Sequence, residues 1–463
     1  MHRFDPHLAE IRFGYGLSPV VGAPSDAAAM LDGVIAPDHM AQRYPTEDFQ
    51  TFLDRAAAVH ATRIQQREHR GTALEQAAKQ RRKKIKQEAR RAWIGWAGHT
   101  FLRRIYAQTA FRERLVAFWA DHFTARGTIN VYNRATTPYV DDAIRPSIAL
   151  RFADLLQASV MHPLMLDYLD QARSMGPQSA MAKRRAGRKA SGLNENLARE
   201  VLELHTLGVD GPYTQADVTE LAKLFAGMSF QVGKGYHFRA EFVEPGTEFV
   251  LGRSYPDAGG DSAVRAALED LSVHPATARH IAWKLAVHFT SDDPDAALID
   301  ALEHAFLGND GALMPVYDVL LNHPAAWHPT LVNCKPPIDF VSSALRALAP
   351  APEVVTGAKP NAVVKTVLRP LATMGQVWEK PVGPDGWSER DGDWMTPQGM
   401  AARVTWAMQA PPRIKDPLPD PRDFVNTALG QYVDEPVRFA ARAAESRSEA
   451  IGLILMSPAF QRR

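Results

Sequence analysis

The chain has 463 residues, of which 46% are hydrophobic and 23% are charged, a composition typical of globular proteins. Lys and Arg number 53 and Asp and Glu number 52, so the chain as a whole carries no strong field that would attract an anionic partner. A single cysteine, Cys334, excludes an internal disulfide and a zinc site built from cysteines. No apolar run has the length of a signal peptide or a membrane helix, so we expect a cytoplasmic protein without a membrane segment.

Helical periodicity dominates the sequence. From about residue 51 to residue 122 the chain has no proline and almost no glycine, and apolar residues recur three and four positions apart. This pattern predicts two or three long helices, which include a long basic helical segment at 55–92. We expect residues 1–463 to form one large, mainly α-helical domain.

Three segments depart from this pattern. Residues 228–255 alternate aromatic or branched residues with polar ones around Gly and Pro, which predicts a small β-hairpin. Residues 350–397 are rich in Pro, Gly and Trp and predict an ordered loop layer with one helix near 361–378. Residues 174–193 predict a basic loop insertion.

A short repeat marks the corners between helices. His-Pro follows an apolar helix end at three places in the chain. Proline at the first helical position loses no hydrogen bond, so the preceding His162, His274 and His323 are predicted to be structural. Thr214 and Asp217, three residues apart, predict a capping box at another helix start.

Residues 194–208, "NENLAREVLELHTLG", combine a helical pattern with an unusual number of polar side chains. On a helical wheel, Asn196, Glu200 and Glu203 share the face opposite Leu197 and Val201. Two carboxylates three residues apart can act as general acid and base or bind a divalent cation. Glutamate-rich helix faces are more often solvated, and that structural alternative stays open.

Neighbouring polar residues extend this hypothesis. Glu200 and Glu203 are the candidate catalytic base or metal ligands, and Arg199 would orient an anionic group. His122 in "FWADHF" is a further candidate catalytic residue, although a lone histidine among aromatics is more often part of the core. The candidate substrate-binding residues are Asn194, Asn196, Asp170, Asp217 and His205.

Two basic clusters, "RRKKIKQEARR" at 81–91 and "KRRAGRK" at 183–189, could neutralise phosphates. Neither contains aromatic residues that would stack on bases, and a solvated helix face and a loop explain them equally well. Nucleic-acid binding is therefore the less favoured interpretation. The second cluster directly precedes Asn194 and could position an anionic ligand there.

Several long motifs together resemble one known family. They are "RFGYGLSP" at 12–19, "FWADHF", "HPLMLDYLD" at 162–170, "NENLAREVLELHTLGVDGPYTQADVTELAKLFAG", "HPATARHIAWKL", "KPPIDFVSSALRAL" and "MGQVWEKPVGPDGW". Over nearly its whole length the chain resembles the bacterial family known as domain of unknown function 1800. The resemblance implies a fold neighbourhood and not a reaction.

The chain departs from the family pattern at defined positions. A histidine is usual where Ala120 stands, so the resemblance does not bring a two-histidine metal site to this chain. Thr-Gly-Trp is usual where Ala226, Gly227 and Met228 stand, and the link "GPQSAMAKRRAGRKASGL" is longer and more basic than usual.

Three interpretations of function follow. The favoured one is an enzyme, a hydrolase or a metal-dependent enzyme, that binds an unidentified small or anionic ligand in a polar cleft beside helix 194–208. A divalent metal ion is the cofactor that the carboxylates could hold. The alternatives are a non-catalytic binding or assembly protein in which this block is a structural network, and a protein that binds an anionic polymer or nucleic acid through its basic clusters.

Overall fold

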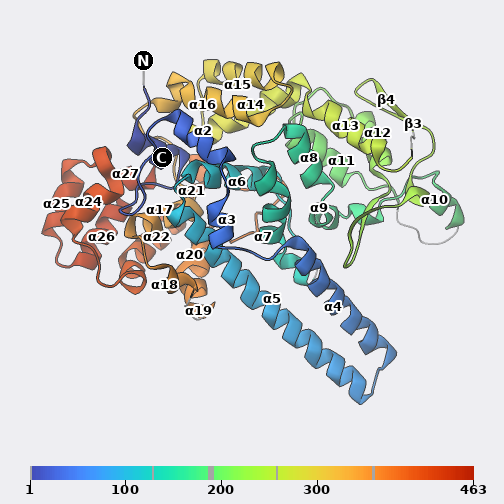
Figure 1. Ribbon diagram of the computed structural model, residues 1–463, viewed down its shortest axis with the longest axis horizontal. Coiled ribbons are helices and arrows are strands. Elements are labelled where there is room, and N and C mark those ends of the chain that lie inside the picture. Colours follow the sequence, from blue (N-terminus) through green and yellow to red (C-terminus); the bar gives the residue numbers. More distant parts are fainter. Residues whose placement is uncertain (1–2, 128–129, 186–191, 257–258, 357–359) are drawn as a thin grey trace.

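The computed structural model describes residues 3–127, 130–185, 192–256, 259–356 and 360–463. In these residues the protein is predominantly helical and has two small antiparallel sheets, which confirms the predicted mainly α-helical class. Figure 1 shows the helices gathered into one broad body from which a single pair of helices projects. No helix in the described ranges has the length and apolarity needed to cross a membrane.

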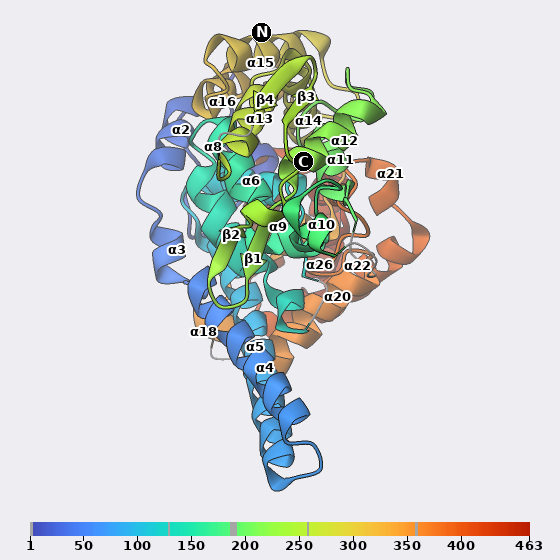
Figure 2. The ribbon, with the colours of Figure 1, turned by 90° about the vertical axis from the view of Figure 1, so that its right-hand side faces the viewer.

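The N-terminal part of the chain contributes short helices to the body and then forms the projecting arm. The short helices are α1 (Pro6–Leu8), η1 (Ala9–Phe13), α2 (Ala27–Ile35) and α3 (His39–Arg43). The arm is an antiparallel pair, α4 (Phe49–Glu68) and α5 (Ala73–Tyr106), and Figures 1 and 2 show its tip far from the other helices. The predicted long basic segment 55–92 lies on this arm. The C-terminal end of α5 returns to the body, where it packs against α17 (Pro337–Leu348).

The middle of the chain is built from short helices whose ends are marked by prolines and turns. They are α6 (Ala110–His122), η2 (Asn130–Arg134), α7 (Thr136–Tyr139), η3 (Val140–Ile144), η4 (Arg145–Ser147), α8 (Phe152–Val160), α9 (Pro163–Tyr168), η5 (Gln171–Arg173), α10 (Ala180–Arg184), α11 (Asn196–Glu200), η6 (Val201–His205) and α12 (Gln215–Phe225). The predicted insertion 174–193 falls partly outside the described residues, which end at 185 and resume at 192. Only its described part, including α10, has an assigned structure.

The segment 228–255 forms two small hairpins, which confirms the small β-hairpin predicted in this region and adds a second one. Strand β1 (Met228–Gln231) pairs with β2 (Gly235–Phe238), and β3 (Thr247–Val250) pairs with β4 (Arg253–Pro256). The 3-10 turn η7 (Ala240–Phe242) separates them. Pro245 lacks a backbone N–H, and Gly246 has a φ of 126°, so the chain cannot continue as one ladder here.

The remaining chain is again helical. It comprises α13 (Ser262–Ser272), α14 (Pro275–Phe289), α15 (Ala296–Gly308), α16 (Leu313–Asn322), η8 (Pro324–Trp327), α17, α18 (Pro352–Thr356), α19 (Pro360–Val363), η9 (Val364–Leu368), α20 (Arg369–Thr373), α21 (Asp391–Trp394), α22 (Pro397–Gln409), α23 (Pro411–Ile414), α24 (Pro421–Leu429), η10 (Gly430–Tyr432), α25 (Glu435–Ala443), α26 (Arg447–Met456) and α27 (Pro458–Gln461). Inside 350–397, helical structure is continuous from 360 to 373, close to the predicted helix near 361–378, and α18 and α21 are further short helices that the prediction of one helix did not include.

The His-Pro corners have the predicted structural role. Each histidine is the N-cap of the next helix, and its Nδ1 accepts a hydrogen bond from the backbone N–H two residues later. These bonds are 3.1 Å for His162, 3.1 Å for His274 and 3.3 Å for His323. The predicted capping box of Thr214 and Asp217 is also present at the start of α12.

Two hydrophobic clusters form the core. The larger cluster contains residues of α6, α8, α9, α11 and α12 and of the four helices α13, α14, α15 and α16. The smaller cluster contains residues of the C-terminal part of α5, of α17 and of the helices after residue 360. Helix α5 contributes to both clusters, with Trp96 in the larger and Phe101 in the smaller. The seam between the clusters contains charged side chains and a cavity.

Candidate functional site

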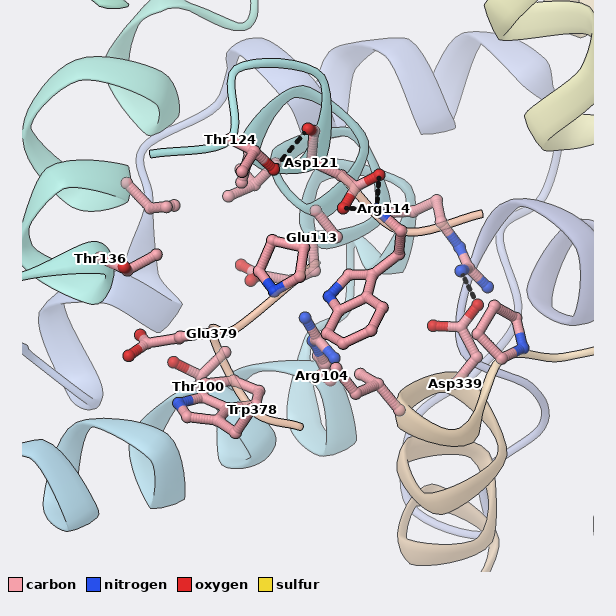
Figure 3. A pocket seen from close by; sticks show the side chains of 18 of the residues that line it. Thr100, Arg104, Glu113, Arg114, Asp121, Thr124, Thr136, Asp339, Trp378 and Glu379 are labelled. Atoms are coloured by element: carbon pink, nitrogen blue, oxygen red, sulfur yellow. Dashed lines mark hydrogen bonds and ion pairs between the residues drawn. The ribbon is translucent and has the colours of Figure 1, made fainter. Parts of the chain in front are cut away.

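A cavity of about 190 Å³ lies at the seam between the two hydrophobic clusters. Its walls come from the C-terminal part of α5, one face of α6, the α7 and η3 turns, the start of α17, and the loop 376–389. Figure 3 shows charged side chains from these elements pointing toward one another around the space. The loop belongs to the Pro-, Gly- and Trp-rich tract, which thus closes one side of the cavity.

The sequence of α6 explains why one of its faces is charged. Glu113, Arg114, Ala117, Asp121 and Thr124 line the cavity, at the three- and four-residue intervals that place side chains on one helix face. Apolar residues on the remaining faces, such as Leu115 and Trp119, are fully buried in the larger cluster. The helix therefore holds its polar stripe toward the seam.

One side of the cavity is a closed frame of arginines and carboxylates. Arg145 donates to both carboxylate oxygens of Glu113 at 2.9 and 2.7 Å, and Arg103 donates to both oxygens of Asp141 at 2.8 Å. Burial raises the pKa of Asp141, but Arg103 and Arg145 outweigh it and hold that pKa below its usual value. Paired groups of this kind fix the geometry of a buried region.

A second closed cluster surrounds Asp339 on α17. Its carboxylate pairs with Arg114 from α6 and lies 3.1 Å from the guanidinium of Arg463. Despite burial, these two cations hold the pKa of Asp339 well below its usual range. Arg114 also donates to the carbonyl oxygen of Gly14 at 2.7 Å and packs 4.5 Å from the Tyr15 ring. Protein groups therefore already surround its guanidinium.

Glu389 and His288 form a third pair. Nδ1 of His288 lies 2.7 Å from a carboxylate oxygen of Glu389, and Arg463 lies 3.8 Å from the other oxygen. Burial raises the pKa of Glu389, but His288 and Arg463 lower it further than burial raises it. Glu389 therefore adds negative charge to the wall that it shares with Asp121.

Asp121 differs from these acids because it has no cationic partner within ion-pair distance in the described chain. Its carboxylate accepts one backbone hydrogen bond, from Trp387 N–H at 3.0 Å. Burial, followed by the negative charge of Glu389, raises its pKa to about 7. Gly386 has a φ of 81°, and a Cβ there would lie 2.6 Å from Asp121 Oδ2, so only glycine allows this approach of the loop.

Glu379 is the second acid of the cavity whose pKa is raised. It accepts hydrogen bonds from Trp93 Nε1 at 2.6 Å and from the Thr137 hydroxyl. Burial raises its pKa to about 7, although both hydrogen bonds oppose the shift. Its backbone has a φ of 56°, which costs a non-glycine residue about 1 kcal/mol or more and is often found at functional sites.

Arg104 is the cation of the cavity without an acidic partner. In the described chain its guanidinium makes no ion pair, and its one hydrogen bond goes to the Ser342 hydroxyl at 3.5 Å. It packs 5.0 Å from the Tyr15 ring and 6.0 Å from the Trp378 ring. Figure 3 shows Arg104, Asp121 and Glu379 on different sides of the same space.

The helix 194–208 lies outside this cavity: none of the predicted site residues is among those that line it. The helix has a regular part, α11, followed by the wider π-turn η6, so the helical-wheel spacing holds only up to Glu200. Asn196 is exposed at the start of α11. Asn194 serves the same helix start: its Nδ2 donates to the Leu169 carbonyl at 2.7 Å, and its Oδ1 accepts from the Asn196 N–H at 3.1 Å.

Arg199 and Glu203 take part in a half-exposed network. The Arg199 guanidinium donates to Glu203 at 3.1 Å and to the Gln215 amide oxygen at 2.8 Å. Glu195 accepts hydrogen bonds from Gln215 at 2.9 Å and from Thr219 at 2.7 Å. The network fastens α11 to α12, and it commits the Arg199 charge to protein partners.

Glu200 is the member of the predicted set whose environment is most unusual. Burial raises its pKa to about 7, and the negative charges of Glu203 and Asp385 act in the same direction. Asp385 lies in the loop that also brings Trp387 onto Asp121. Glu200 is thus coupled electrostatically to the loop that covers the cavity, and its predicted role stays a prediction.

His122 and His205 are buried side by side in the larger cluster. A ring nitrogen of His122 lies 3.2 Å from the His205 carbonyl oxygen, and the two ring centres are 6.1 Å apart. Burial lowers the pKa of His205 to about 3 and lowers that of His122 well below its usual value. Both are therefore neutral near pH 7. His122 follows Asp121 directly, but it packs into the core and does not line the cavity.

The two predicted aspartates have local roles. Asp170 is exposed and has a φ of 55° in the turn before η5. Asp217 completes the capping box with Thr214, and it also accepts a hydrogen bond from Leu251 N–H at 2.7 Å, which holds the second hairpin against α12. The structure does not bring either of them together with Glu200.

Metal binding has little support among the described residues. There, no group of three or more His, Cys, Asp or Glu side chains is placed so that it could hold a metal ion. Glu200 and Glu203 would have to bind a cation without a third ligand of these types from that part of the chain. Their predicted role as ligands is untested.

The sequence analysis missed Asp121, Glu379 and Arg104. Asp121 stands beside His122 in "FWADHF", so this motif also contains a residue that lines the cavity. Glu379 lies in the Trp-rich tract, where its left-handed backbone has no sequence marker. Arg104 belongs to a long basic helix, and only the fold shows that it makes no ion pair with the described residues.

The fold and the cavity define a predominantly helical protein with a charged pocket at the seam of two hydrophobic clusters. The family model described as "Protein of unknown function (DUF1800)" matches residues 9–462. The chain therefore belongs to the DUF1800 family, as the motif resemblance predicted. No curated protein matches this chain, and no solved structure matches it either.

Proposed function

We propose that this protein is an enzyme that acts on a small anionic substrate in the cavity between α5, α6 and the loop 376–389. One observation carries the proposal: Asp121, a carboxyl group with a pKa of about 7, lines the same cavity as Arg104, a guanidinium without an acidic partner in the described chain. Groups with strongly displaced pKa values in a cavity are typical of catalytic sites.

Arg104 would bind the anionic group of the substrate. A guanidinium presents a planar fork of N–H donors that matches a carboxylate or a phosphate. The nearby Tyr15 and Trp378 rings limit water around it, so an incoming anion would replace only part of a hydration shell. The other arginines of the cavity that pair with acids, such as Arg145 and Arg114, have no comparable capacity.

Hydrolysis is the reaction class that this arrangement supports best. It needs a group that takes a proton from the attacking water and a group that gives a proton to the leaving atom. At neutral pH, two carboxyl groups with a pKa of about 7 supply both forms, and Asp121 and Glu379 both line the cavity. Asp121 is assigned the larger role because Glu379 already accepts hydrogen bonds from Trp93 and Thr137. The cytoplasmic location predicted from the sequence is part of this proposal.

The test combines binding and turnover. Thermal shift measures binding of phosphate and citrate as simple anions, and a panel of chromogenic carboxylate and phosphate esters measures hydrolysis. Arg104→Gln should abolish stabilisation by anions. Asp121→Asn should keep that stabilisation and lower kcat by about 100-fold or more, the usual contribution of a general acid or base.

A surface variant, Arg442→Gln, is the matched control because exposed Arg442 pairs with exposed Glu435 and neither residue lines the cavity. It should behave like the wild-type protein in both assays. Anion binding that survives Arg104→Gln would exclude the assigned role of Arg104, and hydrolysis that survives Asp121→Asn would exclude that of Asp121.

A second interpretation applies to the block 194–208 itself. The contacts of Arg199, Glu195 and Gln215 favour a structural polar network that holds α11 against α12. This interpretation predicts that Arg199→Gln lowers thermal stability without a specific effect on turnover. A loss of turnover at unchanged stability would instead return this block to the catalytic site.

A further inference from the structure

The helical arm carries a concentration of positive charge that the cavity does not use. Residues 55–92 contain twelve Lys and Arg but three Glu, while the rest of the chain contains 41 Lys and Arg and 49 Asp and Glu. A nearly neutral protein is thus divided into a strongly cationic arm and an acidic body. Figures 1 and 2 show that this arm, α4 and α5, stands away from the body.

One face of α5 forms a cationic groove of about 400 Å³. Its residues recur three and four positions apart along α5, and one more comes from the end of η2. They are Lys79, Arg82, Lys83, Lys86, Gln87, Arg90 and Arg134. The described residues that line the groove include no acid and no apolar side chain.

The charges of this groove are largely uncompensated. Lys79 pairs with Glu75 at 2.6 Å, whereas Arg82, Lys86 and Arg90 make no ion pair in the described chain. Partial burial and the like charge of Arg82 lower the pKa of Lys86. Crowded cations repel one another, so an arriving polyanion would relieve an unfavourable interaction already present in the free protein.

Core packing does not explain the outer part of the arm. Along α5 from residue 73 to residue 91, the buried residues are Ala78 and Ala89. The facing helix α4 adds Ala56, Val59 and Thr62, and this small interface contributes little compared with the conformational entropy of ordering two long helices. The outer arm therefore extends farther than the stability of the body requires.

We propose that the α5 groove binds the phosphodiester backbone of nucleic acid without reading the base sequence. The cations from Lys79 to Arg90 span about 16 Å along the helix, enough to face about five phosphates of one strand at about 3.4 Å each. The groove has no aromatic side chain to stack on bases, so it would hold the backbone alone.

The shape of the groove favours nucleic acid over a membrane surface. A hollow between α5 and Arg134 can enclose a narrow chain of phosphates, whereas a lipid headgroup layer is flat. Membrane-bound helices also insert apolar residues beside their cations, and this face has none.

Fluorescence anisotropy with labelled random-sequence RNA and duplex DNA tests the proposal. The wild-type affinity should fall steeply with salt, because each neutralised phosphate releases a counterion. The variant with Arg82→Gln, Lys86→Gln and Arg90→Gln should bind at least tenfold more weakly in low salt. Its log–log slope with salt should be smaller by about three, since each lost contact removes about 0.9.

The matched control neutralises three exposed cations of the same helix that do not line the groove: Arg81→Gln, Lys84→Gln and Arg91→Gln. Both triple variants remove three positive charges, so any difference between them reflects the position of the charges. The control should lose clearly less affinity for nucleic acid than the groove variant, and both variants should melt at the same temperature. The proposal is overturned if both variants lose the same affinity for nucleic acid, or if the wild-type protein does not bind nucleic acid in low salt. It is also overturned if the protein binds phosphatidylserine vesicles in place of nucleic acid.

Discussion

The carboxylate of Asp121 accepts a hydrogen bond from the backbone N–H of Trp387, which lies 266 positions later in the chain and 3.0 Å away in the fold. This contact fastens the loop 376–389 to the end of α6 and closes the cavity on that side. It also places a carboxyl group with little compensating charge in a buried position. The proposed chemistry depends on both consequences.

The approach of the loop depends on Gly386. A Cβ at this position would lie 2.6 Å from Asp121 Oδ2, and its φ of 81° is unfavourable for other residues. Gly386→Ala should therefore lower the free energy of unfolding by about 2 to 4 kcal/mol, from strain and overpacking together. Urea denaturation measures the loss.

Gly392→Ala is the matched control for this change. Gly392 lies in the short helix α21, and a Cβ there would meet no atom within 4 Å. Alanine favours helix over glycine, so this variant should be as stable as the wild-type protein or slightly more stable. Equal destabilisation by both substitutions would contradict the close contact at Gly386.

The raised pKa of Asp121 predicts a particular dependence of stability on pH. Its pKa of about 7 in the folded protein exceeds the ordinary value of 3.8, so folding favours the protonated form. This group's contribution to the free energy of unfolding is fully present below pH 4 and is lost as the pH rises to 7. At roughly 1.4 kcal/mol per pKa unit, the loss amounts to at most about 4 kcal/mol. Glu389, Asp385 and Lys284 also act on this group.

Asp121→Asn removes this titration. The difference in melting temperature between variant and wild type should therefore change between pH 4 and pH 8 in favour of the variant. Thermal melts in a pH series measure it. A difference that stays constant over this range would mean that Asp121 has an ordinary pKa.

Asp339 should be essential for the stability of the seam. Asp339→Asn leaves the buried guanidinium groups of Arg114 and Arg463 without their carboxylate, and breaking a buried ion pair costs about 3 to 5 kcal/mol. Glu435→Gln breaks an exposed pair with Arg442 and should cost less than about 1 kcal/mol. Chemical denaturation of both variants compares them, and similar small losses would contradict the structural role of Asp339.

Glu200 and Glu203 should respond differently to the same substitution. At pH 8 the Glu200 carboxyl is ionised in a half-buried site that opposes ionisation, so Glu200→Gln should raise the melting temperature. Glu203→Gln removes the half-exposed pair with Arg199 and should lower stability by less than about 1 kcal/mol. Elemental analysis of both variants and of the wild type checks the predicted ligand role. Metal bound by the wild type and lost from both variants would show that these carboxylates are ligands.

The sequence predicted the features of the fold that depend on local chemistry. Helical periodicity identified the mainly α-helical class. The His-Pro corners were correct because a proline and the preceding histidine cap a helix by contacts two residues apart, as at His162. The predicted hairpin within 228–255 was also correct, and Pro245 and Gly246 divide that region into two ladders.

The site was harder to predict because its properties arise between distant segments. In the described chain Arg104 makes no ion pair, while the neighbouring Arg103 pairs with Asp141 and Arg114 pairs with Asp339. Asp121 has a raised pKa only because a loop more than 250 residues later buries it. No local pattern records such pairings, whereas the helix 194–208 attracts notice through polar residues that are adjacent in sequence.

The pKa of Asp121 is the property on which the proposed site depends most. Carbon-detected NMR on protein labelled with ¹³C-aspartate can follow its carboxyl signal through a pH titration, and Asp121→Asn assigns that signal. The account predicts a midpoint near pH 7. A midpoint near the ordinary value of 3.8 would show that Asp121 is ionised at neutral pH like an exposed carboxylate, and it would contradict the proposed catalytic role.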